Sequence, residues 1–114
     1  MASEGMKNRY LKFDAGQDGT GIRDEFSGYI DLKELPISGD LIREITQWVA
    51  EYPSAPYESS NLTPSEISKH DDLGISLMKR TAIELGDGYK FKYFSDITSM
   101  EYLLMDNGSI KKYS

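Results

Sequence analysis

Cysteine is absent from the 114-residue chain, and His70 is its only histidine. The lack of cysteine excludes disulfides, thiolate metal sites and cysteine nucleophiles. A zinc site needs three or four ligands, and one histidine among carboxylates is a poor supply of them. The sequence therefore predicts neither a metal site nor a cofactor.

Long apolar runs are absent as well. No segment approaches the roughly 20 apolar residues of a membrane span, and the N-terminus lacks an apolar signal region. We therefore predict a cytoplasmic protein that makes no contact with a membrane. Residues 1–8 are expected to be a disordered or vector-derived start, with Met1 or Met6 as the initiator, and residues 9–114 to form a single domain.

Catalytic and nucleotide-binding motifs are also missing. The chain has no Gly-x-Ser-x-Gly sequence, and its glycines fit neither the P-loop nor the dinucleotide fingerprint. His70 precedes Asp71 and Asp72, but adjacent helical residues do not face one another, so a solvated stretch near a helix start is the favoured interpretation. We predict no catalytic residues. A small enzyme that uses carboxylates and His70 is kept as a hypothesis.

One loop resembles a calcium-binding loop in part. Asp14, Asp18, Gly19 and Glu25 match positions 1, 5, 6 and 12 of an EF-hand loop. Gly16 leaves position 3 without a ligand, and the preceding residues have the pattern of a strand and not of a helix. An ordinary turn-rich loop is therefore favoured over a calcium site.

Charge is unevenly distributed along a chain whose formal net charge is −6. Residues 14–72 hold thirteen Asp or Glu against four Lys or Arg. Direct binding to nucleic acid is disfavoured, because phosphate contacts require a cationic surface. The acidic half indicates either a basic partner or a device that only maintains solubility.

Two helices are predicted. Thr63-Pro64-Ser65-Glu66 has the features of a capping box with proline at the first helical position, and Gly86 would end that helix. Ser38 is the expected N-cap of the other helix, which ends before Pro53. The buried faces are predicted at Leu77, Met78, Thr81, Ala82 and Leu85 in the later helix, and at Leu41, Ile45, Trp48, Val49 and Tyr52 in the earlier one.

Strands are predicted around these helices. The expected strands are residues 9–13, 25–31, 89–94, 100–105 and 110–113. Phe26 and Ile30 would share one face of the second strand, and Asn107-Gly108 predicts a hairpin turn between the last two. The fold class is therefore α+β, a two-layer α/β arrangement with a mostly antiparallel sheet of about five strands and two helices on one face.

Aromatic residues are numerous, with eight tyrosines and one tryptophan. Trp48, Phe91 and Tyr93 fall on predicted core faces. Tyr52, Tyr57 and Tyr113 fall at element ends or in loops, where they would either form a protein interface or close the edges of the core. The pattern leaves both interpretations open.

The layout resembles a known family. An acidic helix with Trp48 near its end is followed by a Pro/Ser/Tyr loop, then by DDLGISLMKRTAIELG at residues 71–86 and YKFKYFS at residues 89–95. This order and phrasing, over residues 9–95, is similar to small immunity proteins of bacterial polymorphic-toxin and contact-dependent growth inhibition systems.

The resemblance implies a cytosolic bacterial protein that binds the C-terminal domain of a cognate toxin, usually a nuclease, and covers its active site or a nearby surface. A monomer within a 1:1 complex is expected. An acidic surface suits a basic nuclease. The predicted partner-binding residues are Asp40, Glu44, Glu51, Glu58, Asp71 and Asp72. The alternative is a non-enzymatic acidic adaptor or structural domain.

Overall fold

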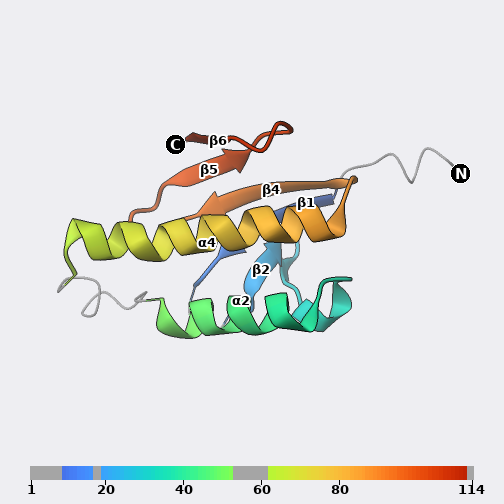
Figure 1. The fold of residues 1–114 in the computed structure, drawn as a ribbon, viewed down its shortest axis with the longest axis horizontal. Helices are drawn as coiled ribbons and strands as arrows, with labels where there is room; N and C mark the ends of the chain where they lie inside the picture. Colours follow the sequence, from blue (N-terminus) through green and yellow to red (C-terminus); the bar gives the residue numbers. More distant parts are fainter. Residues whose placement is uncertain (1–8, 17–18, 53–61, 113–114) are drawn as a thin grey trace, which may run out of the picture.

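The computed structural model describes residues 9–16, 19–52 and 62–112. It is an α+β structure in two layers, with two long helices on one face of a six-stranded sheet (Figure 1). The predicted fold class is confirmed, although the sheet has six strands. The elements are β1 (Arg9–Asp14), β2 (Gly21–Asp24), β3 (Gly28–Tyr29), a 3-10 turn (Leu32–Glu34), α2 (Gly39–Glu51), α4 (Pro64–Leu85), β4 (Tyr89–Phe94), β5 (Glu101–Leu104) and β6 (Ile110–Lys112).

The strand order in the sheet is β3-β2-β1-β4-β5-β6. The central pair, β1 and β4, is parallel, and every other pair is antiparallel. Parallel neighbours need a long crossover, and here it contains both helices. One consequence matters for function: β1 and β4 end at the same edge of the sheet, where α2 also ends and α4 begins (Figure 1).

The predicted second strand, residues 25–31, is wrong except at residues 28–29, which form β3. Residues 25–27 form a turn between β2 and β3, and Phe26 is 79% exposed whereas Ile30 is buried, so the two do not share one face of a strand. The cause is local, because the Asp24 carboxylate accepts a hydrogen bond from the Phe26 amide and Gly28 has a φ of 113°. These features favour a tight turn over a continuous strand.

The strand predicted at residues 89–94 is confirmed with the same ends, and those at 9–13 and 100–105 are confirmed with ends that differ by one residue. The strand predicted at 110–113 is confirmed as far as Lys112, because Tyr113 lies outside the described residues.

Both predicted helix starts are confirmed. The Ser38 hydroxyl accepts from the Leu41 amide at α2, and Thr63 with Glu66 forms a complete capping box at α4. Gly86 ends α4 with a φ of 77°. Among the described residues, no helix is long and apolar enough to cross a membrane.

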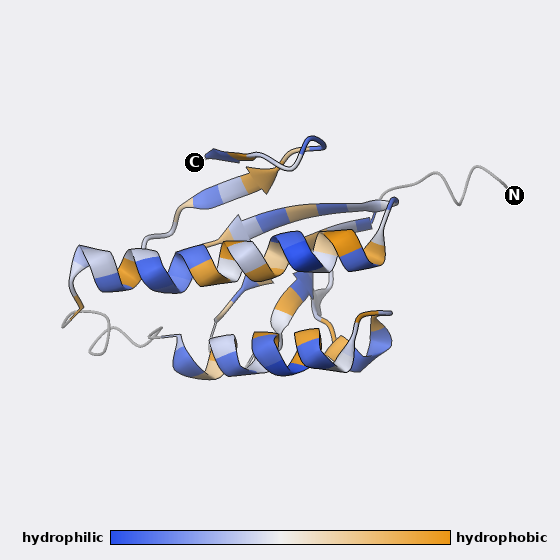
Figure 2. Ribbon diagram, viewed as in Figure 1, coloured by the Kyte–Doolittle hydropathy of each residue, from blue (hydrophilic) through white to orange (hydrophobic). Residues whose placement is uncertain are grey.

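The core lies between the helices and the central strands. Trp48 of α2 is 1% exposed and packs against Phe13 of β1 and Tyr93 of β4. Gly74 lets α4 approach closely, because a Cβ there would lie 2.5 Å from Tyr93 and 2.6 Å from Trp48. Figure 2 shows apolar residues interspersed with polar ones along both helices, and the buried ones include Leu41 and Ile45 of α2 and Leu77 and Met78 of α4. The predicted core roles of Trp48, Phe91 and Tyr93 are confirmed.

Candidate interaction surface

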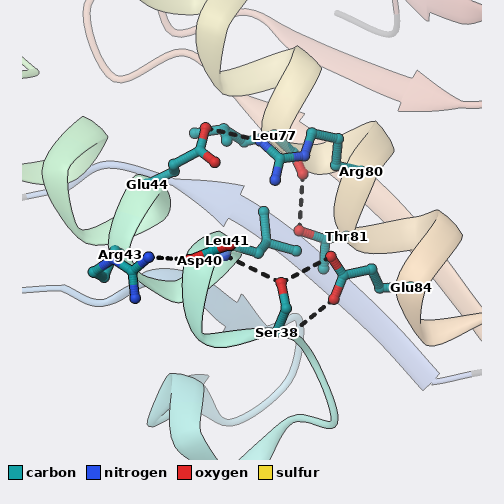
Figure 3. A network of polar contacts seen from close by, with 9 residues as sticks. All are labelled: Ser38, Asp40, Leu41, Arg43, Glu44, Leu77, Arg80, Thr81 and Glu84. Atoms are coloured by element: carbon teal, nitrogen blue, oxygen red, sulfur yellow. Dashed lines mark hydrogen bonds and ion pairs between the residues drawn. The ribbon is translucent and has the colours of Figure 1, made fainter.

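The structure divides the predicted acidic residues into two groups. Asp40 and Glu44 lie in the first half of α2, where each meets an arginine (Figure 3). Asp40 pairs with Arg43, and Glu44 accepts a 2.8 Å hydrogen bond from Arg80 of α4. Their charges are therefore largely matched within the protein.

A third carboxylate on this side of the helix pair, that of Glu84, stabilises the fold. Glu84 of α4 accepts hydrogen bonds from both the amide and the hydroxyl of Ser38, at 2.7 and 3.0 Å (Figure 3). It joins the end of α4 to the N-cap of α2. This side of the helix pair is thus an internal network of polar contacts.

Glu51 and Asp72 lie at the opposite end of the helix pair. Both are exposed, and neither forms an ion pair with another described residue. The chain neighbours of these two residues, Tyr52 and Asp71, are hydrogen-bonded to each other, so Glu51 and Asp72 flank the same helix–helix junction. The predicted Glu58 lies outside the described residues.

Asp71 does not belong with the exposed carboxylates. The prediction of a solvated stretch is wrong here, because Asp71 is only 8% exposed and accepts three hydrogen bonds of 2.7 Å. The donors are the hydroxyls of Tyr52, Tyr93 and Ser95. Asp71 is therefore committed to the interior, where it joins α2, α4 and the end of β4.

The two tyrosines of this cluster are held in their neutral form. Burial, followed by the adjacent Asp71 charge, raises the pKa of the Tyr52 hydroxyl well above its ordinary value. Burial and the neighbouring Tyr52 and Asp71 raise the pKa of Tyr93 further. Tyr52 is thus a core residue at the helix end, while Tyr57 and Tyr113 lie outside the described residues.

His70 contributes to the packing of α4 against α2. Its carbonyl accepts a 3.1 Å hydrogen bond from the Trp48 indole, and its ring lies edge-on to Tyr52 with centroids 5.9 Å apart. The described residues hold no group of three or more His, Cys, Asp or Glu arranged to bind a metal ion. Asp14, at the first position of the calcium-like loop, closes β1, and Asp18 lies outside the described residues.

The structure brings together a further pair of carboxylates that the sequence did not predict. Asp14 ends β1 and Asp96 follows β4, and the parallel pairing brings them to one edge. Burial and the Asp14 charge raise the pKa of Asp96, and burial and the same charge raise the pKa of Tyr29 to about 12. The pair could not be predicted because the sequence does not show that the two strands pair in parallel.

These residues define one region, which we call the carboxylate end. Its members are Glu51, Glu66, Asp72 and Asp96, and the buried Asp14 lies near enough to Asp96 to repel its charge. Nearby cations are few: Lys69 on α4, and Arg23, which lies 3.9 Å from Asp14. The region is a negatively charged surface suited to a basic partner.

A comparison with family models decides the class of the protein. The model described as Serratia CdiI immunity protein-like matches residues 11–96. The chain belongs to this family. No curated protein matches the chain.

This immunity protein therefore has a cognate toxin as its binding partner, and its role is to neutralise that toxin. The matched residues run from β1 to just beyond β4 and include both helices. They contain the whole carboxylate end. The β5–β6 hairpin lies outside the match.

Proposed function

We propose that this immunity protein neutralises a basic nuclease toxin, in a 1:1 complex in the bacterial cytoplasm, by laying its carboxylate end over the toxin's active site. An RNase is the favoured target. Nucleases bind phosphate groups with cationic side chains, so the carboxylates of an inhibitor can bind the same side chains in place of the phosphates. Complementary charge also speeds association, which matters for an inhibitor that must act before the toxin does.

The observation that carries this proposal is the difference between the two ends of the helix pair. Asp40 and Glu44 are paired with arginines of the same chain. Among the described residues, the carboxylates of Glu51 and Asp72 accept hydrogen bonds only from the neutral side chains of Gln47 and Ser68, and neither is paired with a cation. A carboxylate without a cationic partner in its own chain keeps its charge available to another protein. We therefore leave Asp40, Glu44 and the buried Asp71 out of the predicted interface, keep Glu51 and Asp72, and propose that it lies at the carboxylate end.

The Asp14–Asp96 pair supports the same interpretation. Asp96 loses solvation by burial and is repelled by Asp14, so its charged form is unfavourable for the fold. Groups that oppose stability concentrate at functional sites. A lysine or arginine of the toxin placed beside Asp96 would relieve this repulsion.

The first experiment is rescue by co-expression. The toxin domain encoded by the reading frame immediately upstream would be expressed with the immunity protein, and growth and co-purification would be measured. Affinity would then be followed between about 50 and about 300 mM salt, a range over which screening of exposed charges changes strongly. We expect a tight complex that weakens as salt rises.

Matched variants locate the interface. The triple variant Glu51→Gln, Asp72→Asn, Asp96→Asn should bind the toxin domain at least about tenfold more weakly and with a flatter salt dependence. The control is Asp40→Asn with Glu44→Gln, which removes two carboxylates that already have arginine partners. If the control lost as much affinity as the triple variant, or if the triple variant bound unchanged, the proposed surface would be wrong.

A further inference from the structure

Part of the sheet has no helix above it. α2 packs on β2, and α4 packs on β4 and β1, whereas β5 and β6 stand beyond α4 (Figure 1). The side chains of Tyr102, Leu104 and Ile110 lie on the helix side of this hairpin, because Tyr102 pairs with Tyr93 and Leu104 pairs with Ile110. Among the described residues, no helix covers them.

Two cavities follow one another along α4 in this space. The first, of about 540 Å³, lies between Ile67 and Ile75 of α4 and Tyr102 and Ile110 of the hairpin. The second, of about 690 Å³, lies between Ala82 and Ile83 of α4 and Leu104 and Met105. We call the two together the α4–hairpin groove.

The groove is lined by isoleucines of α4 that are incompletely buried. Leu77 and Met78 are buried against the core, at 1% and 0% exposure. Ile67 and Ile75 are half-buried, and Ile83 is 80% exposed, although all three line the groove. Ile75 also packs against the core, whereas Ile67 and Ile83 are not part of it, so the fold of this chain alone does not account for isoleucine at those two positions.

The width of the uncovered strip suits one helix. Adjacent strands lie about 4.8 Å apart, so two uncovered strands present a strip of roughly 10 Å. Packed helices lie about 8–10 Å apart. A third helix placed beside α4 would therefore continue the helical layer across the sheet.

One charged residue of α4 in each cavity gives the occupant a direction. Asp72 lines the first cavity. Lys79 lines the second, where Asp87 and the Lys90–Asp106 ion pair lie beyond the end of α4. Asp72 and Lys79 are seven residues apart on α4, or about two turns and roughly 10 Å. Neither forms an ion pair with a described residue, and Asp72 also belongs to the carboxylate end. The groove is thus continuous with the proposed toxin-binding surface.

We propose that the α4–hairpin groove binds an amphipathic helix of the toxin, with an apolar stripe against the isoleucines, a basic side chain at Asp72 and an acidic one about two turns away at Lys79. This inference rests on the proposed function and adds a second, apolar contact to it. Addition of a toxin strand to the edge of the sheet is less suitable, because β6 has three residues and two of them are Lys111 and Lys112.

The test compares a half-buried residue of α4 that lines the groove with an exposed residue of α4 that does not. Ile67→Gln changes a groove residue that precedes the first buried residue of α4, so folding should be preserved. Leu73→Gln is the control, because Leu73 is 45% exposed on the same helix and does not line the groove. Binding of the toxin domain would be measured by calorimetry, with thermal unfolding as the check on structure. We expect Ile67→Gln to weaken binding at least about fivefold with an unchanged salt slope, and Leu73→Gln to have little effect.

A second pair of measurements tests the occupant. Lys79→Glu should weaken binding, because it repels the acidic side chain expected there; stronger binding would overturn the proposed charge pattern. Hydrogen exchange of the complex should leave the outward amides of β6 unprotected. Protection of those amides would show that a toxin strand pairs with β6, and it would overturn the proposal that a toxin helix occupies the groove.

The proposal for the groove and the proposal for the acidic surface can be disproved separately. Loss of binding confined to the carboxylate-end variants would overturn the groove and leave the proposed function standing. Loss of binding in Ile67→Gln, with unchanged binding of a double variant Glu51→Gln, Asp96→Asn that leaves the groove residue Asp72 in place, would support the groove and overturn occlusion by the other acidic residues. Equal losses for Ile67→Gln and Leu73→Gln would also overturn the groove.

Discussion

The hydroxyl of Tyr93 in β4 donates a 2.7 Å hydrogen bond to the carboxylate of Asp71 in α4. Tyr52 and Ser95 donate hydrogen bonds to the same carboxylate. Among the described residues, Asp71 forms no ion pair with a cation. A buried carboxylate without a cation is stable only when hydrogen bonds replace its water. This cluster fixes the junction of α2, α4 and β4 directly beneath the carboxylate end.

Removal of the acceptor should destabilise the protein strongly. In Asp71→Ala the hydroxyls of Tyr52, Tyr93 and Ser95 lose their shared partner, and we expect the free energy of unfolding to fall by about 2–4 kcal/mol. Asp72→Ala, one residue away on the exposed side, should change it by less than about 0.5 kcal/mol. Urea unfolding measures both. A similar small effect for the two variants would contradict the structural role of Asp71.

Gly74 tests the close approach of α4 to the core. An alanine Cβ would meet Tyr93 and Trp48 at 2.5 and 2.6 Å, so Gly74→Ala should destabilise the protein by about 1–3 kcal/mol, despite the higher helix propensity of alanine. Gly39→Ala is the matched control, because its Cβ would meet only Arg43, at 3.9 Å. Thermal unfolding of the two variants should show a lower Tm for Gly74→Ala alone. A stabilised Gly74→Ala would show that the helix can move outward.

The features that the sequence predicted are those decided by neighbouring residues. The cap at Ser38, the capping box at Thr63 and the stop at Gly86 each depend on a few consecutive positions. The turn at residues 25–27 is local too, but it was missed because the apolar spacing of Phe26 and Ile30 outweighed the turn signals of Asp24 and Gly28.

The missed parts of the site depend on long-range pairing. Asp14 and Asp96 meet only because β1 and β4 are parallel, and no local pattern reports the order of strands in a sheet. Asp71 carried a usable signal, since it lies seven residues before Met78 on the same helical stripe. Its acidic character led to the opposite prediction. A buried aspartate is recognised from its donors, which here come from two other segments, the end of α2 and the end of β4.

Ion pairs on the open face of the sheet should contribute to stability. Lys12 and Lys92 are neighbours in the register of β1 and β4, and Glu101 lies 2.9 Å from Lys12. Glu101→Gln leaves the two lysines with less compensation, so we expect a loss of about 1 kcal/mol that shrinks at high salt. Asp106→Asn, at a carboxylate 88% exposed, should have a smaller effect. Equal effects in urea unfolding would contradict this difference.

The pH dependence of stability should have opposite signs for Asp96 and Glu66. The pKa of Asp96 is raised by burial and by Asp14, so the folded state holds its proton above the ordinary value of 3.8. Its contribution to stability therefore falls as pH rises through the interval between 3.8 and the raised pKa. Asp96→Asn should make the protein more stable at neutral pH, and the difference should disappear in acid.

Glu66 supplies the control. The amide and hydroxyl of Thr63 lower the pKa of Glu66, so its stabilising contribution is present above its unfolded pKa and is lost as pH falls through the folded pKa. Glu66→Gln should be less stable than the wild type at neutral pH and similar to it in acid. Urea unfolding across this pH range tests both. If Asp96→Asn were more stable and also bound the toxin domain more weakly, Asp96 would be a residue that the fold retains for binding, because its charge favours the partner and opposes folding.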